Sequence, residues 1–96
     1  MSPINKKKLN LIRIKLDRLD TELLKLIKKR SNLVNDVLKV KIYKNEIIDQ
    51  KRIDFILKKI KKKSVQLKID PKITSRIWKN MIWSFIDYEK RNFKKK

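Results

Sequence analysis

The sequence predicts an all-α fold, with one long N-terminal helix and two shorter helices in a single domain spanning residues 1–96. Three observations carry this prediction. Apolar residues recur at spacings of three and four along most of the chain, and no segment alternates apolar and polar residues as a half-buried strand does. Glycine is absent altogether, which removes type I′ hairpins and glycine-rich phosphate-binding loops.

The first helix is expected over residues 7–41. Its apolar positions keep the helical spacing from Leu9 to Leu38, and neither proline nor glycine interrupts them. At 1.5 Å per residue, such a helix is about 50 Å long. The remainder of so short a chain is too small to cover an apolar stripe of that length, so we expect a second chain to cover it.

Residues 42–48 break this periodicity and are expected to form a connecting loop. The second helix is expected over residues 49–66, because Asp49 is an acidic residue suited to a helix N-terminus. The third helix is expected over residues 70–93, where Asp70 serves as the N-cap and a proline directly follows it at the first helical position.

The composition excludes several kinds of site. Cysteine and histidine are absent, so disulfides, Cys/His zinc sites, cysteine nucleophiles and Ser-His-Asp relays are excluded. We expect neither a metal nor a cofactor. No apolar run approaches the roughly 18 residues of a membrane span, and the N-terminal segment is too charged for a secretory signal. We therefore expect a cytoplasmic protein that has no membrane partner.

The net charge favours an anionic partner. Lys+Arg number 29 against 10 Asp+Glu, which gives +19, and such a charge suits nucleic acid, a membrane surface or a small acid. Lysine (23), isoleucine (15) and asparagine (7) are enriched together. These residues have AT-rich codons, so compositional drift would also account for the charge. A basic helical nucleic-acid-binding protein stays an alternative of a different class, although we expect no specific nucleic acid as a partner.

A few polar residues are candidates for a site. Arg30 and Lys41 are eleven residues apart, which on a helix returns to within about 20° of the same face. Asp49 and Arg52 share a face at the start of the second helix, and Glu89 lies on the third. By spacing alone, these residues could equally be solvated charges or an ordinary helix-start pair.

Five segments of the chain carry motifs in a fixed order and spacing. Residues 11–30 contain an arginine, a repeated apolar-Asp pair and a leucine run that ends in arginine. Residues 38–41 contain K-x-K, and residues 47–52 contain I-x-D-x-x-R. An Asp-Pro helix start lies in residues 67–71, and a closing Ile-Trp…Glu lies in residues 77–89. Together they resemble the all-helical chorismate mutases. The resemblance implies an intertwined helical homodimer that rearranges chorismate to prephenate, in phenylalanine and tyrosine biosynthesis, without a cofactor.

The resemblance also implies roles for individual residues. Arg30 matches an arginine that binds a substrate carboxylate, and Arg13 matches a second one that the neighbouring subunit contributes. Lys41 matches the lysine that donates to the ether oxygen of the breaking bond. Asp49 and Arg52 match a pair that lines and orders the site.

Glu89 matches a position that is usually glutamine, and glutamate in some members, which hydrogen-bonds the same ether oxygen. Two positions depart from the family pattern. Ile53 stands where many members have a glutamate that contacts the substrate hydroxyl, and Phe85 stands where many have serine. Isochorismate pyruvate lyases share the fold and resemble this chain at both positions, so that activity is the alternative. Asp49 favours the mutase, since the lyase pattern tends to lose it.

The spacing of the two arginines gives an independent geometric expectation. Arg13 and Arg30 are 17 residues apart on one uninterrupted helix, which corresponds to roughly 26 Å. Two arginine side chains and one small diacid cannot comfortably bridge that distance. If both residues serve one substrate, Arg13 has to come from another chain, which again implies a dimer with two sites.

Overall fold

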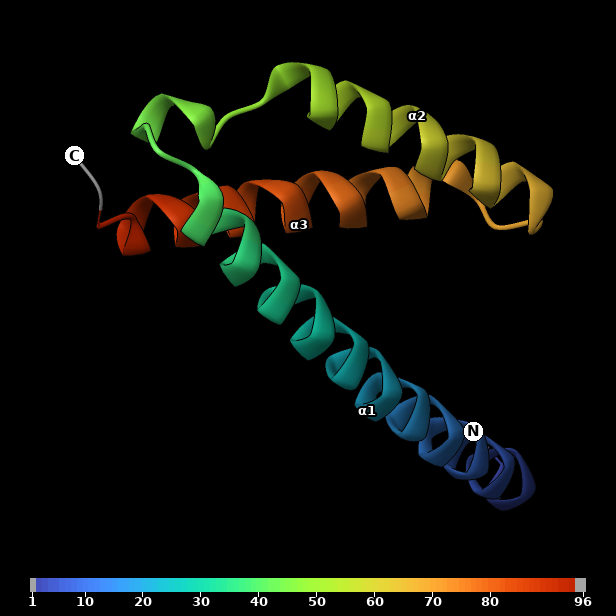
Figure 1. The fold of residues 1–96 in the computed structure, drawn as a ribbon. Coiled ribbons are helices and arrows are strands. Elements are labelled where there is room, and N and C mark those ends of the chain that lie inside the picture. The colour runs from blue at the N-terminus through green and yellow to red at the C-terminus, as the bar shows by residue number, and fades with distance from the viewer. Residues whose placement is uncertain (1, 95–96) are drawn as a thin grey trace. The chain divides into compact units, whose positions relative to one another are not determined.

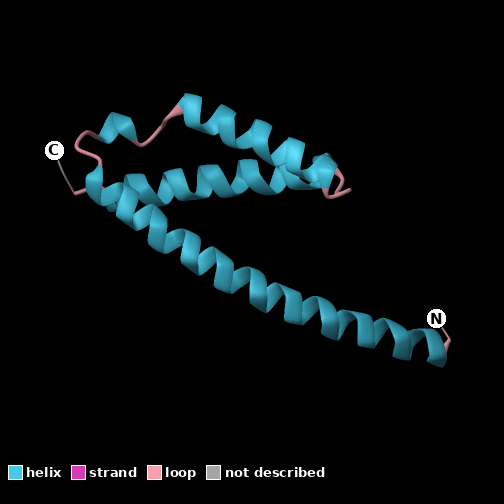
Figure 2. Ribbon diagram, turned by 45° about the vertical axis from the view of Figure 1, so that its right-hand side comes forward, coloured by secondary structure: helices cyan, strands magenta, loops and turns pink. Residues whose placement is uncertain are grey.

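The computed structural model describes residues 2–94, and in that range it contains three α-helices and one short 3-10 helix. They are α1 (Pro3–Val40), η1 (Lys44–Glu46), α2 (Gln50–Gln66) and α3 (Pro71–Asn92), shown in Figure 1. No strand occurs among the described residues (Figure 2), and the all-α prediction is confirmed. The chain divides into two parts, one up to Leu33 and one from Val34 onward, and each is described by itself.

Helix α1 begins four residues before the expected start at residue 7. Pro3 occupies its first position, where the missing N–H costs nothing. Ser2 caps the helix, because its Oγ accepts a hydrogen bond of 3.2 Å from the backbone N–H of Asn5. The helix ends at Val40, and the backbone N–H of Lys41 still donates to the carbonyl of Val37 at 3.2 Å.

Both shorter helices begin at the aspartates that the sequence indicated. The Asp49 carboxylate accepts a hydrogen bond of 3.0 Å from the backbone N–H of Arg52, and Asp70 accepts one of 2.9 Å from that of Lys72. Each bond satisfies a backbone donor that has no partner inside its own helix. The observed bounds of α2 and α3 therefore agree with the expected ranges to within one residue at each end.

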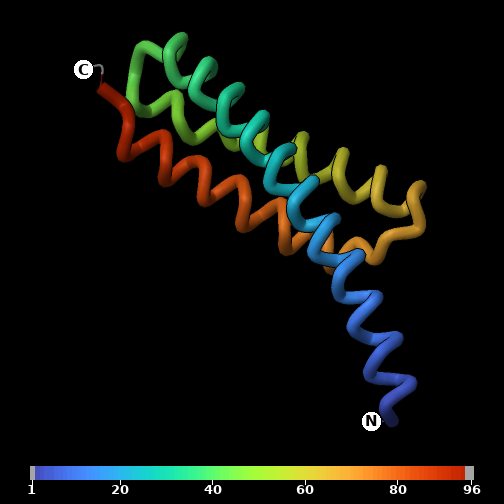
Figure 3. Tube along the Cα trace, turned by 90° about the horizontal axis from the view of Figure 1, so that it is seen from below, coloured from blue at the N-terminus to red at the C-terminus, as the bar shows by residue number. Residues whose placement is uncertain are grey.

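The connection between α2 and α3 is tight, and Figure 3 shows the sharp reversal of the chain there. The backbone N–H of Ile69 donates to the carbonyl of Ser64 at 2.8 Å, and that of Lys68 donates to the carbonyl of Val65 at 3.1 Å. This is the Schellman pattern of a helix C-terminus, which needs a left-handed residue after the cap. Lys68 fills that position with φ 58°, although glycine is the residue best suited to it.

The second part contains the hydrophobic core, which lies where α2 and α3 pack against each other. Its buried apolar residues are Ile47, Ile53, Ile82 and Ile86. Ile47 belongs to the segment expected as a loop and yet is only 3% exposed. The η1 turn accounts for this, because the Glu46 carboxylate accepts from the backbone N–H of Tyr43 at 2.9 Å and closes the loop on itself.

A buried polar contact joins α2 and α3 close to the turn that connects them. The hydroxyls of Ser64 on α2 and Thr74 on α3 lie 2.7 Å apart, and both residues are buried. Ser64 Oγ also donates to the carbonyl of Ile60 at 2.6 Å. The two hydroxyls are hydrogen-bonded to each other, so neither is left without a partner when it is buried.

Candidate active site

A shielded ion pair in the second part joins Lys41 and Glu89. Lys41 lies just beyond the end of α1, and Glu89 lies on the buried face of α3. Lys41 Nζ donates to Glu89 Oε1 at 3.2 Å, and the two side chains are only 16% and 7% exposed. The pair is 48 residues apart in sequence, so the fold rather than local sequence brings it together.

Burying this ion pair costs free energy. Removing two charges from water carries a penalty of several kcal/mol per ion, which the attraction between them only partly offsets. A lysine and a carboxyl group side by side can, however, aim donors at one external oxygen, provided that the carboxyl group is protonated. Together they can stabilise negative charge that grows on a bound molecule.

Asp49 lies near Lys41 at a hollow in the protein surface. The hollow has a volume of about 410 Å³ and is lined by Lys41, Glu46, Ile48, Asp49, Gln50 and Lys51. One oxygen of the Asp49 carboxylate caps α2, so the side chain is held in place by the helix it begins. The structure thus brings two of the expected site residues to one concave surface.

Arg52 and Phe55 lie on the first turns of α2. The Arg52 guanidinium carbon is 5.4 Å from the centre of the Phe55 ring, within the range of a cation–π contact. The contact between Asp49 and Arg52 is made through the Arg52 backbone. Arg52 is exposed, so its guanidinium remains accessible to an anion.

The two positions that depart from the family pattern differ in their surroundings. Ile53 is 6% exposed and packs in the core with Ile47, Ile82 and Ile86. Phe85 is half-buried on α3, one turn before Glu89. The Ile53 side chain is therefore part of the core. That Ile53 and Phe85 contact a substrate stays a prediction.

Arg13 and Arg30 both belong to the part up to Leu33. Helix α1 is unbroken between them, so the separation of roughly 26 Å along its axis holds in the folded chain. Arg13 is exposed and Arg30 is half-buried. That either arginine shares a substrate with Lys41 stays a prediction.

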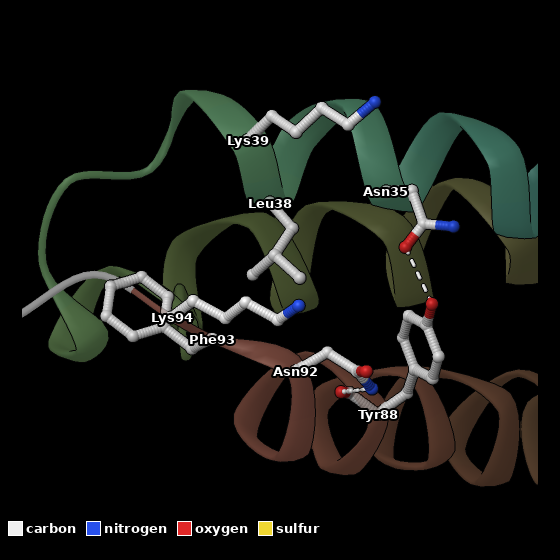
Figure 4. Close-up of a pocket in the computed structure, with 7 residues that line it drawn as sticks. All are labelled: Asn35, Leu38, Lys39, Tyr88, Asn92, Phe93 and Lys94. Carbon is white, nitrogen blue, oxygen red and sulfur yellow. Dashed lines mark hydrogen bonds between the residues drawn. The ribbon is translucent and has the colours of Figure 1, made fainter.

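Sequence reasoning missed a polar contact directly beside Glu89. The Tyr88 hydroxyl donates to Asn35 Oδ1 at 2.7 Å, which ties the last turns of α1 to α3 (Figure 4). The pocket around this bond has a volume of about 330 Å³ and is lined by Asn35, Leu38, Lys39, Tyr88, Asn92, Phe93 and Lys94. None of the expected site residues lines it. No short-range pattern could have indicated a contact between residues 53 positions apart.

No group of three or more histidine, cysteine, aspartate or glutamate side chains among residues 2–94 is placed to hold a metal ion. None of the described helices combines the length and apolar character that crossing a membrane requires.

Comparison with known proteins gives one match. The family model described as chorismate mutase type II matches residues 12–90. No curated protein and no solved structure matches the chain significantly. The matched range includes Arg13, Arg30, Lys41, Asp49 and Glu89.

Proposed function

The chain belongs to the chorismate mutase type II family, and we propose that it rearranges chorismate to prephenate in the cytoplasm, on the route to phenylalanine and tyrosine. The observation that carries the proposal is the shielded contact between Lys41 Nζ and Glu89 Oε1. This [3,3] rearrangement has no covalent intermediate. It needs a flexible dianion held in its compact conformer and donors placed where charge grows.

Each proposed residue has a task that suits its chemistry. Arg30 and Arg13 bind the carboxylates, because the planar guanidinium can bind a carboxylate through two parallel hydrogen bonds. Lys41 donates to the ether oxygen, where negative charge develops as the C–O bond breaks. The carboxylates carry the same charge throughout the reaction, whereas the Lys41 contact strengthens in the transition state. Loss of Lys41 should therefore lower kcat more than it raises KM.

Glu89 can help only in its protonated form. An ionised carboxylate has no proton to donate and would repel the charge growing on the ether oxygen. Glutamine in place of Glu89 would keep the shape and supply a permanent N–H donor to the same oxygen.

A homodimer is part of the proposal, because α1 has an apolar row that the chain leaves open. The row follows an alternating spacing of four and three, typical of a helix that packs along another helix. Each member is between 52% and 64% exposed. We call these residues the α1 row: Ile12, Leu16, Leu19, Leu23, Leu26 and Leu33. Arg30 occupies the vacant position between Leu26 and Leu33, so a second helix on this row would approach it.

The dimer would also complete the site. Because Arg13 and Arg30 are too far apart on α1 to bind one small substrate, we propose that each site takes Arg30 from one chain and Arg13 from the other. Two equivalent sites per dimer follow from the two-fold symmetry that such a dimer normally has.

Isochorismate pyruvate lyase activity is the second candidate, and Ile53 favours it. The buried Ile53 side chain has no polar atom with which to bind the substrate hydroxyl. An NMR assay that supplies both chorismate and isochorismate distinguishes the candidates. Prephenate formation supports the mutase, and faster release of pyruvate from isochorismate would reverse the order.

The direct test is the conversion of chorismate to prephenate by the protein and two variants. Lys41→Ala and Arg30→Ala should each lose at least about 100-fold in kcat/KM, the usual scale for a positioned electrostatic donor. Lys44→Ala, an exposed lysine three residues from Lys41, is the matched control and should keep its activity. Circular dichroism should show folded protein in all cases. Near-native turnover of Lys41→Ala or Arg30→Ala would contradict the assigned roles.

A further inference from the structure

Positive charge is concentrated on α2 rather than spread evenly along the chain. In its 17 residues α2 has seven Lys or Arg and one acidic residue, Asp54. Helix α1 has eleven and four in 38 residues, and α3 has five and two in 22. Compositional drift would enrich lysine along the whole chain, so it does not by itself explain the higher density of cations on α2.

Three of the seven cations of α2 and one aromatic residue form a line on the side opposite the core. Lys51, Phe55, Lys58 and Lys62 follow one another at spacings of four, three and four, which keeps them within a sector of about 60° and a length of about 16 Å. All four are exposed, whereas Ile53 and Ser64 on the other side of the helix are buried. Arg52 and Lys59 lie beside this line, and we call the six residues the basic stripe.

Phe55 is the one aromatic residue of the basic stripe, and its ring is open to solvent. The residue is 53% exposed. The Arg52 guanidinium lies 5.4 Å and the Lys59 ammonium 5.8 Å from the centre of the ring. Both cations lie over the ring, so a base that stacks on Phe55 would replace one of these cation–π contacts and leave that cation to bind a flanking phosphate.

We propose that the basic stripe binds single-stranded nucleic acid without sequence preference, with one base stacked on Phe55 and the flanking phosphates on the stripe cations. The proposal does not depend on the proposed enzymatic activity. An anionic membrane is a poorer fit, since an interfacial helix needs a broad apolar face and the stripe has one apolar residue. An acidic protein surface would use the cations but would leave the exposed ring without a role.

The test is fluorescence anisotropy with a labelled oligothymidylate of twelve nucleotides and the full chain. Binding should weaken with salt along a log–log slope of about −3, as expected for up to five phosphate contacts to a single strand. Phe55→Ala should weaken binding about tenfold and leave the slope unchanged, because stacking releases no counterions. Phe55→Trp should restore the affinity, since the larger ring also stacks.

Two triple variants separate the stripe from net charge. Replacement of Lys51, Lys58 and Lys62 by glutamine should reduce the slope by about 2. Replacement of Lys8, Lys15 and Lys28, which are exposed on α1, removes the same charge and should have a much smaller effect. Equal losses in the two variants would overturn the proposal, as would wild-type affinity in Phe55→Ala. Equally tight binding of polyglutamate would assign the stripe to an acidic protein instead, and circular dichroism of each variant excludes unfolding as the cause.

Discussion

The part up to Leu33 and the part from Val34 onward differ in how they bury their apolar residues. Helix α1 has no buried residue, whereas the second part contains a core of four isoleucines and the buried Ser64, Thr74 and Glu89. Leucines that stay half-exposed on one side of a long helix do not contribute the full free energy that burial of their apolar surface would supply. The candidate reactive pair therefore lies where the chain supplies its own core, and the two candidate carboxylate-binding arginines lie where it does not. The second part holds the candidate contact in its own core, while the first leaves its leucines half-exposed, which is why we propose a partner chain for it.

The largest effect is expected from a charge placed in the α1 row. Leu23→Asp would put two carboxylates into the proposed interface, at a cost of about 4 kcal/mol or more per dimer, which corresponds to about 1000-fold weaker association. Analytical ultracentrifugation should then show a monomer at micromolar concentration, and turnover of chorismate should be lost. Lys25→Asp introduces the same group on the opposite side of α1 and should remain dimeric. A dimeric Leu23→Asp protein would show that the α1 row is not the interface.

A smaller effect, confined to the second part, is expected from Glu89→Gln. Glutamine keeps the shape and has a permanent N–H donor for the ether oxygen, so the variant should keep kcat/KM within about tenfold of the wild-type value. Glu89→Ala leaves no donor at this position and should lose about 100-fold. The measurement is kcat/KM of the three proteins at one pH. Near-native activity of Glu89→Ala would remove Glu89 from the site.

The smallest effect is expected at the turn between α2 and α3. Lys68 has φ 58°, and a residue with a Cβ there costs roughly 1 kcal/mol relative to glycine. Lys68→Gly should therefore raise the free energy of unfolding by up to about 1 kcal/mol, even though it introduces the only glycine of the chain. Lys61→Gly, inside α2, should lower it by a similar amount. Urea denaturation measures both, and a lower stability for Lys68→Gly would contradict the strain assigned to this residue.

The sequence predicted those features that depend on neighbouring residues. Asp49 and Asp70 cap their helices because a short acidic side chain reaches the backbone N–H groups of the next turn. The pair Ser2-Pro3 is the same kind of signal, and taking it into account would have placed the start of α1 correctly. The left-handed Lys68 had no signal at all, because neither glycine nor asparagine marks the position.

Features that depend on distant residues were not accessible from spacing. The contacts Lys41–Glu89 and Tyr88–Asn35 join residues 48 and 53 positions apart. The first was anticipated only through the resemblance to a family, and the second was not anticipated. Ile47 was expected in a loop and is buried, because the η1 turn directs it into a core that residue spacing does not reveal.

If two chains together build one chorismate-binding site, as we propose, mixing two inactive variants should restore activity. Arg13→Ala and Arg30→Ala should each be inactive alone. After subunit exchange at equal concentrations, half of the dimers are hybrids with one intact site, so prephenate formation should recover to about a quarter of the wild-type rate. Exchange is verified independently by native mass spectrometry. No recovery in a mixture that demonstrably contains hybrid dimers would contradict the shared site.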